Sequence, residues 1–122
     1  MKRLLIVDDE KHLRLLYKTE FEADGYEADT AANAHEALEK FESSAYDLVI
    51  LDIRMPGMDG LEALGKFIGR DNKLPVIINS AYDYYKDNFM SWPANSYVIK
   101  SSDLTELKAR VREALGESGM EF

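Results

Sequence analysis

The chain has 122 residues, of which 46% are hydrophobic and 31% are charged, and it contains no cysteine. This length and composition indicate one globular domain, and the lack of cysteine excludes a disulfide framework, a thiolate metal site and a cysteine nucleophile. The formal net charge of −8 argues against direct binding to nucleic acid or to a membrane surface. The apolar opening at residues 4–7 is too short for a signal peptide or a membrane span, so we expect a soluble cytoplasmic protein.

Two strands and two helices are predicted in the first half of the chain. Residues 4–7 are continuously apolar, as in a strand buried on both faces, whereas residues 27–31 are mixed, which favours an edge strand. The helix between them should end at Gly25 in a left-handed C-cap. A second helix should begin after Asn33, an N-cap with Glu36 three positions later. Their apolar stripes are Leu13, Leu16, Tyr17 and Phe21 in the first helix, and Ala34, Ala37, Leu38 and Phe41 in the second.

The second half continues this alternation. Apolar runs at residues 48–51, 76–78 and 97–99 predict three more strands. A helix is expected after Gly60, and a last helix after Asp103, where Glu106 completes a capping pattern. We expect a further helix over 82–92, although its aromatic residues do not form one stripe and Pro93 cuts it short; they could be core or an exposed interaction patch. The clear stripes are Leu61, Leu64 and Ile68, and then Leu104, Leu107, Val111 and Leu115.

Alternating strands and helices predict an α/β fold of the doubly wound class, with a five-stranded parallel sheet covered by helices on both faces. We expect residues 1–122 to form a single domain. In such folds a ligand site lies beyond the C-terminal ends of the strands, near the point where the strand order reverses. The residues that follow the strands are therefore the first candidates for function.

Polar side chains end four of the predicted strands: Asp8 and Asp9, Asp52, Asn79 and Ser80, and Lys100. Three carboxylates at one edge of a sheet would repel one another without a positive counter-charge. Mg²⁺ supplies such a charge, because it binds one or two carboxylates, keeps several waters and accepts phosphate oxygens. The sequence therefore predicts a Mg²⁺ site that receives a phosphoryl group, where positioning and charge neutralisation do most of the catalysis.

Each residue of this set has a predicted role. Asp52 is the best nucleophile, since a carboxylate can attack phosphorus to form an acyl phosphate. Asp8 and Asp9 form a pair suited to metal binding. Lys100 offers a point charge to a phosphoryl oxygen, and Ser80 offers a hydroxyl donor. The turn after Asp52, rich in proline and glycine, leaves a backbone carbonyl free for the cation.

The sequence contains four stretches, in this order: LLIVDDE, DLVILDIRMPGMDG, VIINSAY and YVIK. With them the chain resembles the receiver domain of two-component response regulators over essentially its whole length. The resemblance implies a flavodoxin-like sheet of order 2-1-3-4-5, with no effector domain in the chain. It also implies that Asp52 is the phosphoacceptor. Asp9 would bind Mg²⁺ directly, Asp8 would help through water, and the backbone carbonyl of Arg54 would complete the protein ligands.

The resemblance also implies a switch and its partners. Ser80 would follow the phosphoryl group, Lys100 would pair with it, and Tyr97 would change rotamer. The donor would be a phosphohistidine on a histidine kinase or a phosphotransfer protein. The responding surface would be segment 82–92, the strand at 97–99 and the last helix, which would bind a downstream protein, a separate output domain or a second copy. Two features depart from the family pattern: Ser101 where proline usually follows the lysine, and residues 93–95 in place of a Gly-Ala pair.

Other interpretations stay open. His12 and His35 are interpreted as solvated helix residues, because neither has a second ligand at metal spacing. An aspartate-nucleophile phosphohydrolase would use a similar strand-end carboxylate, but it would carry a second aspartate where this chain has Arg54. A receiver-like scaffold that is never phosphorylated is the third possibility.

Overall fold

The computed structural model describes residues 1–52, 60–71, 73–81 and 96–116. In chain order, the elements are β1 (Arg3–Val7), α1 (Lys11–Ala23), β2 (Glu27–Ala31), α2 (Ala34–Ser43), β3 (Leu48–Leu51), α3 (Gly60–Arg70), β4 (Val76–Ser80), β5 (Ser96–Ile99) and α4 (Thr105–Ala114). The strands are all parallel and form one sheet of order β2-β1-β3-β4-β5. The predicted fold class and strand order are therefore confirmed, with β2 at an edge as expected.

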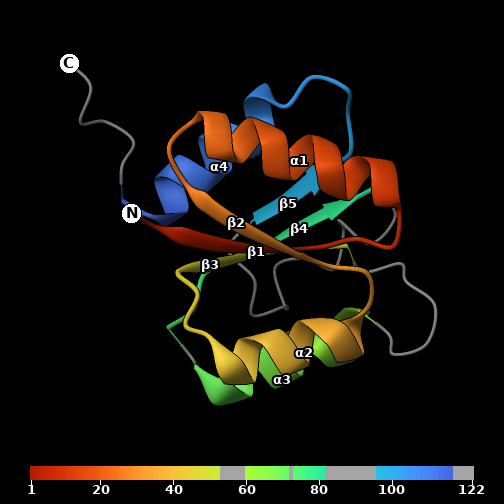
Figure 1. The fold of residues 1–122 in the computed structure, drawn as a ribbon, viewed down its shortest axis with the longest axis vertical. Coiled ribbons are helices and arrows are strands. Elements are labelled where there is room, and N and C mark those ends of the chain that lie inside the picture. The colour runs from red at the N-terminus through yellow and green to blue at the C-terminus, as the bar shows by residue number, and fades with distance from the viewer. Residues whose placement is uncertain (53–59, 72, 82–95, 117–122) are drawn as a thin grey trace.

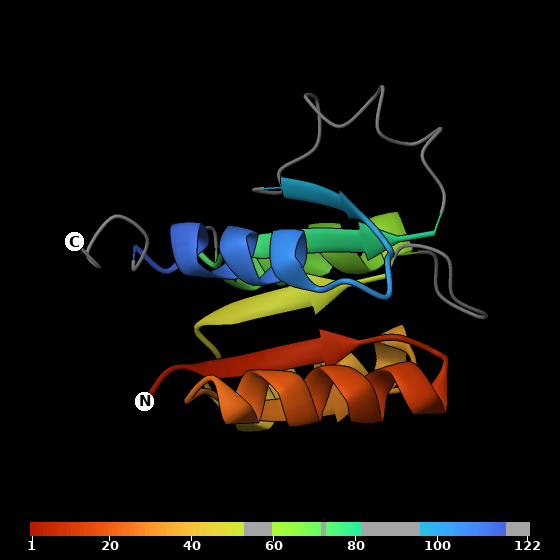
Figure 2. The same cartoon turned by 90° about the horizontal axis from the view of Figure 1, so that it is seen from above.

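Helices cover both faces of the sheet. Helices α1 and α4 lie on one face, and α2 and α3 lie on the other (Figure 1). Seen from above, α1 and α4 run on the near side of the strands (Figure 2). The segment 82–92, predicted as a helix, lies outside the described residues, as do the turn at 53–59 and residues 93–95.

The sheet has an apolar core on each of its two faces, because successive side chains of a strand point to opposite faces. In β1, Leu4 and Ile6 belong to the core under α1 and α4, which includes Phe21 of α1. Leu5 and Val7 belong to the core on the side of α2 and α3. The apolar runs are continuous because both faces of these central strands are covered.

The first two helices end and begin as the sequence predicts. Gly25, just after α1, has φ of 101°, a conformation that glycine adopts without steric cost. At the start of α2, Asn33 Oδ1 accepts the N–H of Glu36 at 2.8 Å. The Glu36 carboxylate in turn accepts the N–H of Ala32 at 2.6 Å, one residue before the expected donor.

Helix α4 begins with a different arrangement from the predicted capping box. The Asp103 carboxylate accepts the N–H of Thr105 at 2.9 Å and its hydroxyl at 2.6 Å, instead of the N–H of Glu106. These bonds lower the pKa of Asp103, because they favour the charged carboxylate. The loop between β5 and α4 is therefore held by its own side chains.

Candidate functional site

The strand register brings the predicted site residues into one row. Val7 pairs with Leu51, and Leu51 pairs with Ile78. Continuing this register by one residue places Asp8, directly after β1, beside Asp52, directly after β3, and Asp52 beside Asn79 of β4. Two-residue alternation then puts their side chains on the face covered by α1 and α4. The Asp52 N–H donates to the Val7 carbonyl at 3.0 Å, so the ladder extends to the nucleophile candidate.

Three carboxylates meet at this edge. Oxygens of Asp8, Asp9 and Asp52 all lie within 4.8 Å of one another. Asp8 and Asp52 are only 1% and 5% exposed, whereas Asp9 is exposed to solvent. A cluster of carboxylate oxygens open on one side fits a hard divalent cation such as Mg²⁺, which takes oxygen ligands and keeps water on the open side. Arg54, the predicted source of a backbone ligand, lies outside the described residues.

The ammonium of Lys100 joins two of these carboxylates. Its Nζ lies 2.8 Å from Asp8 Oδ2 and 2.9 Å from Asp52 Oδ2. Burial disfavours the charged lysine, but the hydrogen bonds and charges of the two carboxylates outweigh it and raise the pKa of Lys100. The sequence predicted this lysine as a partner of a phosphoryl group. In the structure it already supplies part of the counter-charge that the carboxylates need.

Backbone contacts hold these groups in place. The Lys100 N–H donates to the Ser80 carbonyl at 2.8 Å, which fixes the lysine beside the end of β4. The Glu10 N–H donates to Asp8 Oδ1 at 2.9 Å. The Arg14 guanidinium donates to the Asp8 carbonyl oxygen at 2.8 Å. Both contacts anchor Asp8 to the start of α1, and the sequence analysis assigned neither Glu10 nor Arg14 to the site.

The two switch candidates belong to the other face of the sheet. Ser80 is fully buried, and Tyr97, on β5 opposite Ile78, is 6% exposed within the core on the side of α2 and α3. Their proposed movements stay predictions. The described chain contains no cis peptide bond, so the Lys100–Ser101 bond is trans. The Ser101 hydroxyl accepts the N–H of Asp103 at 3.1 Å.

Two residues near the row were seen in the sequence but given no role. Asn79 was noted only as a polar strand end, and Tyr17 only as part of an apolar stripe. In the structure the Asn79 amide donates to the Tyr17 hydroxyl at 3.2 Å, and both side chains are buried. The signal that could have identified them is an amide at the end of an otherwise apolar strand. His12 and His35, in contrast, are exposed on their helices as expected.

Comparisons with known proteins agree with this geometry. Residues 4–112 match the response regulator receiver domain family. YkoG of Bacillus subtilis, described as an uncharacterized transcriptional regulatory protein, is 36% identical over 118 residues, which are 95% of this chain and 52% of YkoG. The regulatory protein AtoC of Escherichia coli is 39% identical over 94% of this chain and 25% of its own length. The chain thus spans about half, or less, of these curated relatives.

A response regulator of known structure is more similar. The response regulator TrrA of Thermotoga maritima, in complex with Mg²⁺-BeF, is 49% identical with a TM-score of 0.89, over 94% of this chain and all of TrrA. TrrA in complex with the histidine kinase ThkA gives a TM-score of 0.87 over 94% of this chain and 99% of TrrA. Within the part of the chain that the structure describes, no helix has the length and apolar character that a membrane span requires.

Proposed function

The chain belongs to the response regulator receiver domain family, and from this premise we propose that it is a phosphorylation-controlled switch. Asp52 accepts a phosphoryl group from a phosphohistidine donor, and the change is passed to a partner. Residues 1–122 then form one receiver domain, whose role is regulatory and whose only catalysis concerns its own phosphorylation and dephosphorylation.

One observation carries the proposal: Asp52 ends a buried strand beside two further carboxylates and a lysine ammonium. An oxygen of Asp52 would form the new bond to phosphorus while the bond from phosphorus to the donor imidazole breaks. Bound at Asp8, Asp9, Asp52 and the Arg54 carbonyl, Mg²⁺ would neutralise charge on the carboxylates and on the phosphoryl oxygens. Lys100, now hydrogen-bonded to Asp52, is within reach of the phosphoryl group that Asp52 would carry.

The partners follow from the same premise. The ThkA complex of TrrA supports a histidine kinase as donor, with a phosphotransfer protein as the alternative. Ser80 and Tyr97 would link the phosphoryl group to the responding surface, formed by segment 82–92, β5 and α4. That surface would bind a downstream protein, an output domain or a second copy of the chain.

Intact-mass spectrometry tests the proposal. Wild-type protein and the Asp52→Asn variant are incubated with Mg²⁺ and acetyl phosphate, with and without EDTA. We expect the wild type to gain the mass of one phosphoryl group only when Mg²⁺ is present, and the variant to gain none. Equal labelling of the two proteins would refute the role of Asp52.

A parallel incubation with generic phosphate esters, read as released phosphate, separates the alternatives. Catalytic hydrolysis of generic phosphate esters, with no stoichiometric label on the protein, would indicate a phosphohydrolase. No label and no hydrolysis would indicate a receiver-like scaffold.

A further inference from the structure

A buried polar pair lies beside the phosphoacceptor candidate. Asn79 Nδ2 donates to the Tyr17 hydroxyl at 3.2 Å, and the two side chains are 3% and 2% exposed. Burying an amide or a hydroxyl costs free energy unless it is hydrogen-bonded, and replacing both members of a hydrogen-bonded pair with apolar groups of the same shape can be nearly neutral for stability. The core on this face of the sheet contains apolar residues such as Ile77 and Val98, so packing alone does not explain a polar pair here.

The place of Asn79 in the sheet relates the pair to Asp52. The register pairs Leu51 with Ile78, and continuing it by one residue places Asn79 next to Asp52 on the same face of the sheet. Adjacent strands are about 4.8 Å apart, so same-face neighbours contact one another. Asp52 therefore stands between Asp8 on one side and Asn79 on the other.

Tyr17 reaches the same group of charges from α1. Burial raises the pKa of Tyr17, the hydrogen bond from Asn79 lowers it in part, and the charges of Lys100, Asp8 and Asp52 all act on the phenol. The phenol oxygen is thus near the cluster, although the Tyr17 backbone belongs to the middle of α1. The hydrogen bond between Tyr17 and Asn79 therefore connects α1 to the end of β4, next to Asp52.

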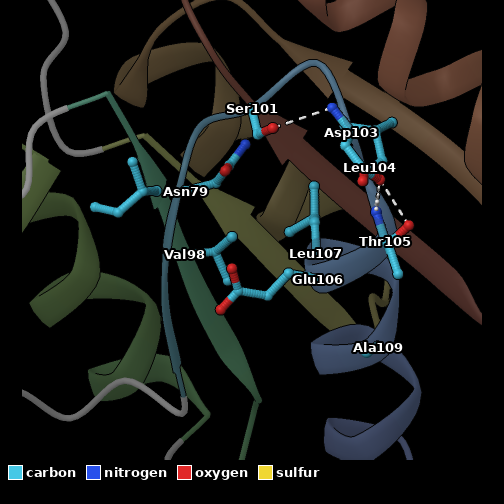
Figure 3. A pocket seen from close by; sticks show the side chains of 10 residues that line it. Asn79, Val98, Ser101, Asp103, Leu104, Thr105, Glu106, Leu107 and Ala109 are labelled. Atoms are coloured by element: carbon cyan, nitrogen blue, oxygen red, sulfur yellow. Dashed lines mark hydrogen bonds between the residues drawn. The ribbon is translucent and has the colours of Figure 1, made fainter.

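Packing does not fix the Asn79 amide on every side. A pocket of about 330 Å³ is lined by Asn79 and Val98 together with Ser101, Leu104 and Leu107. In Figure 3 the Asn79 amide lies at the upper end of this pocket, below Ser101. Asn79 therefore borders this pocket on one side, and its hydrogen bond to the Tyr17 hydroxyl holds the amide on the other.

We propose that Asn79 and Tyr17 are positioning residues for phosphoryl transfer to Asp52. The Tyr17 hydroxyl fixes the Asn79 amide, and the amide limits the orientations that the Asp52 carboxylate adopts beside Asp8. This inference rests on the proposed function, because it needs Asp52 to be the acceptor. Neither residue reaches the surface where a donor binds, so the pair acts on the rate of transfer and not on donor affinity.

Three variants test the pair: Tyr17→Phe, Asn79→Leu and the double variant. Each is phosphorylated with acetyl phosphate and Mg²⁺, and the maximal rate constant and half-saturating donor concentration are measured by intact mass. Small displacements of a reacting group slow a reaction by up to about 100-fold. We expect a maximal rate constant about tenfold lower in all three, at an unchanged half-saturating concentration. Urea unfolding of each protein is measured in parallel.

The double variant separates positioning from a purely structural role. Each single variant leaves one buried polar group without its partner, whereas the double variant removes both, so its unfolding midpoint should return close to that of the wild type. Its phosphorylation should stay about tenfold slow. If stability and rate return together, the pair is structural and the proposal is wrong. Should Asn79→Leu fail to fold, Tyr17→Phe and the double variant decide the question.

A matched control uses another buried tyrosine. Tyr46 donates to Asp29 Oδ2 at 2.7 Å, and it follows α2 instead of lying in α1. Tyr46→Phe should lose stability but phosphorylate at the wild-type rate. A slow Tyr46→Phe variant would overturn the inference, since loss of stability alone would then slow the reaction. If the wild-type protein takes no label at all, the proposed function is refuted. If the wild type and all three variants are labelled at the same rate, only the inference about Asn79 and Tyr17 is refuted.

Discussion

Replacing Lys100 with methionine tests how the charges of the site are balanced. The Lys100 ammonium lies 2.8 Å from Asp8 Oδ2 and 2.9 Å from Asp52 Oδ2, and both carboxylates are buried. With an effective dielectric constant near 20, each pair at such distances attracts by about 6 kcal/mol. Desolvation offsets much of this attraction, and removing one member of a buried ion pair costs about 3–5 kcal/mol. We expect Lys100→Met to lower the free energy of unfolding by about 3 kcal/mol.

The assay is urea unfolding at neutral pH, followed by circular dichroism, in EDTA and then in Mg²⁺. In the variant, Mg²⁺ would replace the ammonium as counter-charge and would no longer be repelled by it. The free energy of unfolding should therefore rise more on adding Mg²⁺ in Lys100→Met than in the wild type.

Lys108→Met is the matched control. Lys108 pairs with Glu20 at 2.9 Å and with Asp24 at 3.2 Å, away from the carboxylate cluster. Its loss should cost less than about 1 kcal/mol, as for other partly exposed ion pairs, and should leave the Mg²⁺ response unchanged. The reasoning is refuted if Lys100→Met is as stable as the wild type in EDTA, or if Mg²⁺ stabilises the two proteins equally.

Three further predictions concern pH and backbone. Because the folded-state pKa of Lys100 is raised, its contribution to stability is fully present below the unfolded lysine pKa of about 10.4 and is lost as pH rises through the folded value. The difference in unfolding free energy between wild type and Lys100→Met, measured by urea unfolding, should thus be constant from neutral pH to about pH 10 and shrink above pH 10. A difference that grows above pH 10 would contradict the raised pKa of Lys100. Gly25→Ala should lower the unfolding free energy by about 1 kcal/mol because φ is 101°. Gly65→Ala should raise it by up to about 1 kcal/mol, because Gly65 lies inside α3 and an added Cβ would meet no described atom within 4 Å beyond its own stretch of helix. Equal effects in thermal unfolding would disprove the distinction. Asn33→Ala should cost about 1 kcal/mol through loss of the N-cap bond, and an unchanged urea midpoint would exclude that role.

The strands and helices were predictable because their signals are local, whereas the strand order was implied by the resemblance to receiver domains. Continuous apolar runs distinguish buried parallel strands from exposed ones, and cap residues such as Asn33 mark where helices begin. The apolar stripe of α3 was incomplete, since it omitted Phe67, which is fully buried and meets Phe41 edge-on at 5.2 Å between ring centroids. Which side of a short helix faces the sheet is decided by the packing of its neighbours, and a single stripe does not specify it.

The site was predictable only in part. Parallel strands bring their C-terminal ends to one edge, so the meeting of Asp8, Asp9 and Asp52 follows from topology. The ion pairs of Lys100 with two carboxylates do not follow from topology, because they depend on where the loop after β5 places the ammonium. The contact between Tyr17 and Asn79 joins residues 62 positions apart, and it depends on how α1 rests on the sheet.

The most direct test of the account locates the phosphoryl group. Wild-type protein is phosphorylated with acetyl phosphate and Mg²⁺, reduced with borohydride, which converts an aspartyl phosphate to homoserine, and digested for peptide sequencing by mass spectrometry. We predict homoserine at position 52 and at no other aspartate, and none after incubation in EDTA. Homoserine at Asp8 or Asp9, or an unmodified Asp52 in protein that carries the label, would contradict the account.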